Sequence, residues 1–157
     1  ISDTRNFDND KSGSTLKSLI EDYGHKCLLI DIVKDEPKEL LFIINKWIND
    51  KNLDVIITSG GTGLTGRDIT VDVLETYFDK KIEGFGELFR FISYKKIGTP
   101  TIQSRAIAGT KNGKYIFCLP GSPSACKDAW EEILKFQLDI RHKPCNFVEI
   151  MPRLNET

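Results

Sequence analysis

The chain has 157 residues, of which 39% are apolar and 29% charged, values typical of one globular domain with a full core. Its 22 basic and 23 acidic side chains leave a net charge of −1, which gives no bulk reason to bind nucleic acid or an anionic membrane surface. Apolar runs such as Leu40–Ile44 are far too short to span a bilayer. We expect a single domain over residues 1–157 with no nucleic-acid or membrane partner.

The four cysteines show no CxxC spacing, and the two histidines stand alone. This pattern does not favour a zinc site or a disulfide framework. Reduced thiols are typical of the cytoplasm, so we expect a cytoplasmic protein.

The first third of the chain predicts two helices and a strand. Ile1-Ser2 resembles the end of a strand, so we expect a first strand whose body lies before Ile1. Apolar spacing over residues 16–23 predicts a helix that stops at Gly24. Cys27–Val33 reads as a strand, and Pro37 is a favoured first residue for the helix that follows.

The rest of the chain continues this alternation. Val55–Thr58 predicts a short buried strand, and Thr70 is a plausible N-cap for the next helix. Residues 85–92 show helical apolar spacing. Asn112-Gly113 predicts a hairpin turn between two apolar runs. A last helix is expected after Pro120-Gly121-Ser122-Pro123, reaching about Leu138.

Alternating strands and helices predict an α/β fold, a three-layer α/β/α sandwich with a mostly parallel sheet and an antiparallel edge hairpin. Ligands bind such folds at the carboxyl ends of the strands. Three polar loops follow predicted strands, namely Lys34–Glu36, Ser59–Asp68 and Pro120–Ser124. We therefore expect these loops to form one site.

Gly60, Gly61, Gly63 and Gly66 lie in a loop between a buried strand and a helix. Glycines let backbone N–H groups converge on an anion, and the following helix N-terminus adds partial positive charge. A plain surface turn is the structural alternative. The loop also carries the hydroxyls of Ser59, Thr62 and Thr65, which exceed the needs of a turn, so we expect it to bind phosphate.

Two known phosphate motifs match this loop only in part. Gly61-x-Gly63-x-x-Gly66 fits the dinucleotide pattern, but several polar residues separate it from Thr70. The same glycines fit half of a Walker A loop, but Arg67-Asp68 replaces the required Lys-Ser or Lys-Thr.

Asp68 would repel a phosphate held in this loop unless a cation intervened. Mg²⁺ is suited to that place because it binds one or two carboxylates together with phosphate oxygens. Asp35, after the preceding predicted strand, is the candidate second ligand. A simple helix N-terminal role before Pro37 is the equal alternative for Asp35, and both interpretations stay open here.

The turn Pro120-Gly121-Ser122 offers a second anion site. Ser122 is expected to cap the last helix, with Pro123 at its first position. The free backbone N–H groups at that helix end would donate hydrogen bonds to a phosphate. A plain capped helix is the alternative.

Longer motifs resemble the molybdopterin-binding MoaB/MogA family, and most closely its MoaB branch. The resemblance covers nearly the whole chain and is carried by Thr58–Thr70, Glu83–Arg90, Gln103–Ala106, Leu119–Cys126 and the opening Ile1–Arg5 with Lys11–Gly13. It implies the molybdopterin-binding fold and a step of molybdenum cofactor biosynthesis. In that step the terminal phosphate of molybdopterin attacks the α-phosphorus of ATP, and pyrophosphate leaves with magnesium assistance.

The resemblance also implies roles for residues. Asp35 and Asp68 match the two acidic residues that the family requires, the Pro120–Ser122 turn would hold the pterin phosphate, and the glycine loop the rest of the ligand. Further matching positions are Ser2, Asp3, Ser12, Gly13, Thr70, Glu83, Gly84 and Arg105. Family members form homotrimers, and the MoaB branch forms hexamers, so we expect a homo-oligomer.

Three other functions remain open from the sequence. A non-catalytic molybdopterin carrier would share the anion sites without transferring AMP. A scaffold module would bind partners independently of Asp35 and Asp68. A generic nucleotide-binding domain is the last alternative, although it would lack the Walker lysine.

Overall fold

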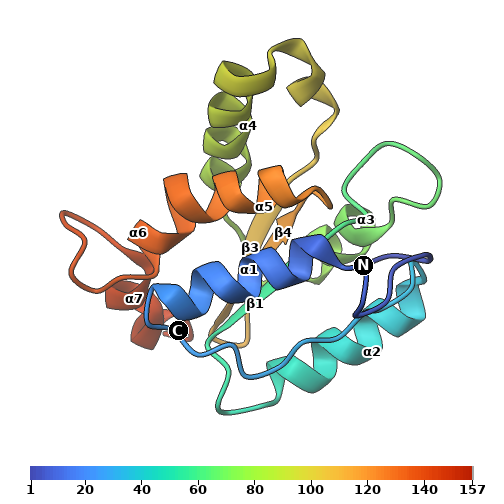
Figure 1. Cartoon of the computed structure of the whole chain (residues 1–157). Helices are drawn as coiled ribbons and strands as arrows, with labels where there is room; N and C mark the ends of the chain where they lie inside the picture. The colour runs from blue at the N-terminus through green and yellow to red at the C-terminus, as the bar shows by residue number, and fades with distance from the viewer. Residues whose placement is uncertain (157) are drawn as a thin grey trace.

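A four-stranded sheet forms the centre of the computed structural model, which describes residues 1–156 (Figure 1). The strand order is β1-β4-β3-β2, in which β1 and β4 are parallel and the other two pairs antiparallel. The strands are β1 (Val55–Ser59), β2 (Lys80–Lys81), β3 (Ile107–Lys111) and β4 (Lys114–Leu119).

Helices cover both faces of this sheet. The α-helices are α1 (Lys11–Asp22), α2 (Pro37–Ile48), α3 (Thr70–Tyr77), α4 (Glu83–Ile97), α5 (Pro123–Ala129), α6 (Lys135–Gln137) and α7 (Phe147–Ile150). A π-helical turn η2 (Trp130–Leu134) joins α5 to α6, and two 3₁₀ turns are η1 (Thr99–Gln103) and η3 (Met151–Arg153). None of the helices described in residues 1–156 is long and apolar enough to cross a membrane.

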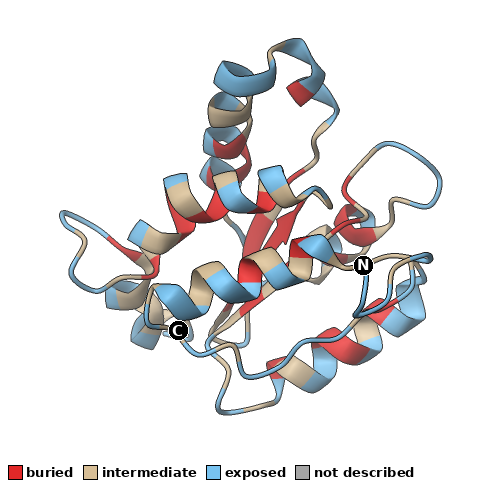
Figure 2. Ribbon diagram, in the orientation of Figure 1, coloured by how far each residue is buried: buried red, intermediate tan, exposed pale blue. Residues whose placement is uncertain are grey.

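Successive side chains of β4 point to two separate cores, as the period of a strand requires. Phe117 packs with residues of α1, α4 and α5, whereas Ile116 packs with residues of α2 and α3. Buried residues accordingly line the sheet and the inner helix faces, while much of α4 projects away from the body and is exposed (Figure 2). The expected α/β/α layering is confirmed.

The edge hairpin is also confirmed, and its turn explains why the sequence signalled it. Asn112 and Gly113 both have positive φ, 48° and 77°, which a two-residue hairpin turn of the favoured twist requires. Gly24, with φ of 94°, likewise follows α1 as expected.

The predicted strand Cys27–Val33 does not form. These residues run without pairing to any strand in residues 1–156, and Leu28, Leu29 and Ile30 remain exposed. The sheet therefore contains fewer parallel pairs than predicted. An apolar run with strand composition needs a neighbouring strand edge to become part of a sheet, and no such edge adjoins this segment.

Candidate functional site

The glycine loop and the Pro120–Ser122 turn lie side by side because β1 and β4 are parallel neighbours that end at the same edge of the sheet (Figure 1). The backbone N–H of Gly60 donates to the carbonyl of Leu119 at 2.9 Å, and the Ser59 hydroxyl donates to that of Pro120 at 3.3 Å. A side chain on Gly121 would lie 3.3 Å from the Gly60 Cα. The structure thus brings together two of the three predicted loops.

Backbone conformation explains the glycines at the start of the loop. Gly60 and Gly61 have φ of 103° and 65°, which side chains rarely tolerate. The loop then returns to α3, where the Thr70 hydroxyl donates to the Gly60 carbonyl and the Thr70 N–H to that of Gly61, both at 3.0 Å. Thr70 is the first residue of α3 rather than its N-cap, which is Ile69, so the predicted capping role is wrong. Its hydroxyl instead holds the start of the loop through the hydrogen bond to Gly60.

Asp35 reaches the same loop from the third predicted segment. A Cβ on Gly61 would lie 3.1 Å from Asp35 Oδ1, so only glycine lets this carboxylate approach the backbone so closely. The backbone N–H of Asp35 donates to Asp3 Oδ1 at 3.1 Å. Partial burial, followed by the negative charge of Asp3, raises the pKa of Asp35 above its ordinary value. A carboxylate whose ionised form is disfavoured by its surroundings is typical of a functional site.

The carboxylate of Asp68 lies against the backbone of the glycine loop at Gly63. A Cβ on Gly63 would approach Asp68 Oδ2 to 2.8 Å. The same oxygen accepts hydrogen bonds from the Thr65 hydroxyl at 2.6 Å and from the Thr65 N–H at 2.8 Å. The hydrogen bond from the Thr65 hydroxyl is the main cause that lowers the pKa of Asp68, so the carboxylate is ionised. Both acidic residues therefore flank the backbone between Gly61 and Gly63.

Arg105, which precedes β3, clamps this loop from outside. Its guanidinium donates to the carbonyls of Gly63 and Asp68, each at 2.7 Å, and to the carboxylate of Asp72 in α3. Its backbone N–H donates to the carbonyl of Thr62 at 3.2 Å. The planar, five-donor guanidinium is suited to holding several acceptors at once. Arg105 thus supports the shape of the loop.

The start of α1 supports the Pro120–Ser122 turn in a similar way. The Ser12 hydroxyl, fully buried, donates to the Gly121 carbonyl at 2.6 Å and accepts from Arg5 at 2.8 Å. The Gly13 N–H donates to the carboxylate of Asp10, the N-cap of α1.

Ser122 caps α5 as predicted. Its hydroxyl accepts a hydrogen bond from the Ala125 N–H at 3.2 Å, and Pro123 is the first residue of α5. Ser122 is exposed at the rim of the site, so its hydroxyl stays accessible to solvent.

The N-terminal residues border the site. The Ser2 hydroxyl accepts hydrogen bonds from the backbone N–H groups of Thr4 and Arg5, and these two bonds close a turn. Asp3 accepts two hydrogen bonds from Arg67, at 2.6 and 2.9 Å, while Arg67 also donates to Glu36 at 3.1 Å. The sequence interpretation gave Arg67 no role beyond the absence of a Walker lysine. Its position in a loop facing several acidic residues was the signal that could have identified it.

Glu83 and Gly84 are not brought to the glycine loop. They begin α4, where both are exposed, and within residues 1–156 no hydrogen bond joins them to the other predicted site residues. Sequence position alone could not show this separation, because it depends on the direction in which α4 leaves the sheet.

Together these features define a class: an α/β protein with an amide-rich loop at the carboxyl ends of its strands, flanked by two carboxylates. Residues 1–140 match the family described as probable molybdopterin binding domain. Molybdenum cofactor biosynthesis protein B of Escherichia coli (strain K12) is 42% identical over 147 residues, which cover 94% of this chain and 86% of that protein.

Solved structures agree with the sequence match. The crystal structure of a molybdenum cofactor biosynthesis protein B has a TM-score of 0.88 at 38% identity, covering 99% of this chain and 92% of that one. The tungsten cofactor synthesizing protein MoaB from Pyrococcus furiosus has a TM-score of 0.72 at 37% identity, covering 80% and 79%. The chain belongs to the MoaB/MogA family of molybdenum cofactor biosynthesis proteins and carries its molybdopterin-binding domain.

Proposed function

We propose that this protein is a molybdopterin adenylyltransferase, which transfers AMP from ATP to the terminal phosphate of molybdopterin. The observation that carries the proposal is the pair of carboxylates, Asp35 and Asp68, packed against the glycine loop at Gly61 and Gly63. A loop meant only to attract phosphate would not place two acidic groups beside its amides. Such a pair is useful where phosphate and a divalent cation bind together.

The donor set fits Mg²⁺ bound jointly by protein and substrate. No group of three or more His, Cys, Asp or Glu side chains that could hold a metal gathers in the part of the chain that the structure describes. Mg²⁺ in nucleotide enzymes commonly takes only one or two carboxylates and completes its coordination with phosphate oxygens and water. Asp35 and Asp68 would hold it, and when bound it would neutralise phosphate charge. A nearby cation would also favour the ionised form of Asp35, whose pKa is raised first by burial and then by the negative charge of Asp3.

The remaining residues would bind and orient the two substrates. An oxygen of the pterin phosphate forms a bond to the α-phosphorus of ATP, and the bond from that phosphorus to the bridging oxygen breaks, releasing pyrophosphate. Backbone amides of Gly61–Gly63 would bind phosphate oxygens, and the Pro120–Ser122 turn would receive the pterin phosphate. Transfer of this kind depends mainly on positioning and charge, so no protein nucleophile is needed.

Replacement of one carboxylate tests the proposal. With molybdopterin and Mg-ATP, the wild-type chain is expected to form adenylylated pterin, measured by chromatography of the product and release of pyrophosphate. Asp68→Asn is expected to lower the rate by roughly 100-fold or more, because it removes the negative charge beside the loop. Asp79→Asn is the matched control. Asp79 pairs with Lys111 at the hairpin, at the opposite end of β3 and β4 from the loop, and its replacement should leave the rate nearly unchanged.

A wild-type chain that binds the pterin but never yields the adenylylated product would refute this activity and support a molybdopterin carrier. One observation favours that second candidate. The Oδ2 of Asp68 already accepts two hydrogen bonds from Thr65, so the residue could serve only to shape the loop. In that case Asp68→Asn would weaken pterin binding, and the affinity would not respond to magnesium or ATP.

We also propose that the protein forms a homo-oligomer through the projecting face of α4 and η1. Five large apolar side chains are exposed along these two elements, which project from the body (Figure 2). They are Leu88, Phe91, Tyr94, Ile97 and Ile102. Large apolar side chains exposed together on one part of a molecule are typical of a protein interface, and a second copy of this chain is the partner that we propose.

A further inference from the structure

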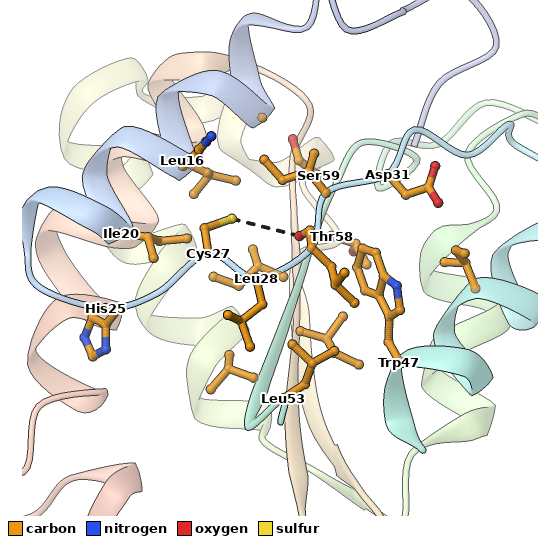
Figure 3. A pocket seen from close by; sticks show the side chains of 18 of the residues that line it. Leu16, Ile20, His25, Cys27, Leu28, Asp31, Trp47, Leu53, Thr58 and Ser59 are labelled. Atoms are coloured by element: carbon orange, nitrogen blue, oxygen red, sulfur yellow. Dashed lines mark hydrogen bonds between the residues drawn. The ribbon is translucent and has the colours of Figure 1, made fainter. Parts of the chain in front are cut away.

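Asp35 and Asp68, the two carboxylates beside the glycine loop, follow segments of the chain that are not direct neighbours. Asp35 comes after the extended segment Cys27–Val33, and Asp68 belongs to the loop after β1. A cavity of about 580 Å³ lies between this segment and β1 (Figure 3). Direct contacts that set the separation of the two carboxylates therefore lie beyond the carboxyl ends of the two segments.

Arg67 makes one such contact from the glycine loop. It immediately precedes Asp68 in the chain, and its Nη1 donates to Glu36 Oε1 at 3.1 Å. Glu36 in turn immediately follows Asp35. Within residues 1–156 no other hydrogen bond joins Lys34–Glu36 directly to the glycine loop. The chain neighbours of the two carboxylate residues are thus bound to each other.

Asp3 provides a second, bridging contact between the same two places. Its Oδ2 accepts hydrogen bonds from Nε and Nη2 of Arg67, at 2.9 and 2.6 Å. Its Oδ1 accepts a hydrogen bond from the backbone N–H of Asp35 at 3.1 Å. A guanidinium presents its donors in one rigid plane, so Asp3 and Glu36 are held in a fixed relation to Arg67.

Arg105 and Arg67 hold different sides of the loop. Arg105 donates to the carbonyls of Gly63 and Asp68, which relates the loop to β3, the strand that Arg105 precedes. Within residues 1–156 no hydrogen bond of Arg105 reaches Asp35 or the residues next to it. The relation of the loop to Asp35 therefore depends on Arg67.

The ion pairs of Arg67 lie at the surface of the molecule. The side chains of Arg67, Asp3 and Glu36 are 58%, 34% and 49% exposed, and ion pairs exposed to this extent contribute little to stability. Three nitrogens of the guanidinium donate to carboxylates, so Arg67 does not stand here as a phosphate ligand in place of the Walker lysine. Its effect is then on the geometry of the site rather than on folding.

We propose that Arg67 is a positioning residue, which sets the separation of Asp35 and Asp68 and thereby the affinity of the site for a divalent cation. Asp3 and Glu36 transmit this effect. A cation bound by two carboxylates needs both at coordination distance, so its affinity depends on their separation. The inference rests on the proposed function only in taking these two carboxylates as the groups that hold Mg²⁺.

The test measures binding of Mn²⁺, a paramagnetic probe for an Mg²⁺ site, to the full chain without substrate. Electron paramagnetic resonance of the free ion gives the dissociation constant. Arg67→Met removes the guanidinium but keeps an unbranched side chain, and it is expected to weaken Mn²⁺ binding roughly 10-fold. Charge alone predicts the opposite result, because loss of a positive side chain would tighten the binding of a cation. The sign of the change therefore separates positioning from charge.

Further variants check that the effect passes through these contacts. Arg67→Lys can hold Asp3 or Glu36 but not both in one plane, so it is expected to retain part of the affinity that Arg67→Met loses. Asp3→Ala is expected to weaken Mn²⁺ binding by itself but to add little to Arg67→Met, because both changes break the same contact.

Arg141→Met is the matched control, since the exposed ion pair of Arg141 with Asp139 lies beyond the end of α6, and it should leave the Mn²⁺ affinity unchanged. The Tm of Arg67→Met should stay close to that of the wild type, which separates a change in the site from a loss of folding.

Unchanged or tighter Mn²⁺ binding in Arg67→Met, beside wild-type binding that Asp68→Asn removes, would overturn this inference alone. A wild-type chain that binds no Mn²⁺ would overturn it together with the proposed cation site. Mn²⁺ binding that weakens in Arg67→Met, in a chain that forms no adenylylated pterin, would refute only the transferase activity and support the positioning role.

Discussion

At the scale of single residues, Asp35 is held in a position where its negative charge is unfavourable. Burial and the nearby Asp3 raise its pKa, while the Ile1 amino group and Arg67 oppose the shift. Ionised Asp35 therefore costs stability above its folded pKa and costs nothing below the unfolded value of 3.8. Such a cost fits a charge that serves another purpose, which here is binding the proposed cation.

Asp35→Asn is accordingly expected to raise Tm at pH 7, and the gain should disappear as the pH falls below about 4. Asp79→Asn is expected to change Tm in the opposite direction. Lys111 lowers the pKa of Asp79, so this replacement should reduce Tm at pH 7 and have a smaller effect in acid. Thermal unfolding of both variants at several pH values measures the two trends. A loss of stability in Asp35→Asn at pH 7 would contradict this account.

At the scale of elements, the loop between β1 and α3 depends on a residue outside both. Arg105 holds the carbonyls of Gly63 and Asp68 and the carboxylate of Asp72 with one guanidinium. Lysine has a single ammonium group and cannot hold these acceptors together. We expect Arg105→Lys to destabilise the loop by about 1–3 kcal/mol and so to raise the KM for the phosphate-bearing ligand more than it lowers kcat.

Hydrogen exchange of Thr62–Asp68 gives a second measurement that does not need substrate, and it should become faster in Arg105→Lys. Arg153→Lys is the matched control, because within residues 1–156 the side chain of Arg153 makes an exposed ion pair with Glu156 and no other. If Arg105→Lys changed neither exchange nor KM, the anchoring role would be wrong.

Elements whose signal is local were predicted well from the sequence. Helices α1, α2 and α4 bury one face at helical spacing, and the Asn112-Gly113 turn needs only its own backbone angles. The strand Cys27–Val33 could not be predicted reliably, because apolar composition specifies a strand only where a neighbouring edge is present. The capping role of Thr70 failed for a similar reason. Its hydroxyl bonds the carbonyl of Gly60, ten residues earlier, instead of its own helix.

At the scale of the whole molecule, much of α4 projects from the body and carries uncovered apolar side chains, although Phe85 and Phe89 near its start are buried in the core. The proposed homo-oligomer predicts that Phe91→Glu, on this face, shifts the protein toward a monomer. Light scattering after gel filtration measures the change. Phe42→Glu is the matched control, since Phe42 on α2 is even more exposed but lies outside the α4 and η1 face. A wild-type chain that is monomeric at high concentration would refute this interface.

The sequence by itself determined the features that depend on neighbouring residues and on motif composition. These include the helices, the hairpin, the glycine loop, the cap at Ser122 and the family. Only the tertiary structure decided which distant groups meet. Asp35 lies against Gly61, Ser12 holds Gly121, and Arg105 supports the loop from 37 residues beyond Asp68. Such contacts are set by how parallel strands bring their carboxyl ends together, which no local pattern records.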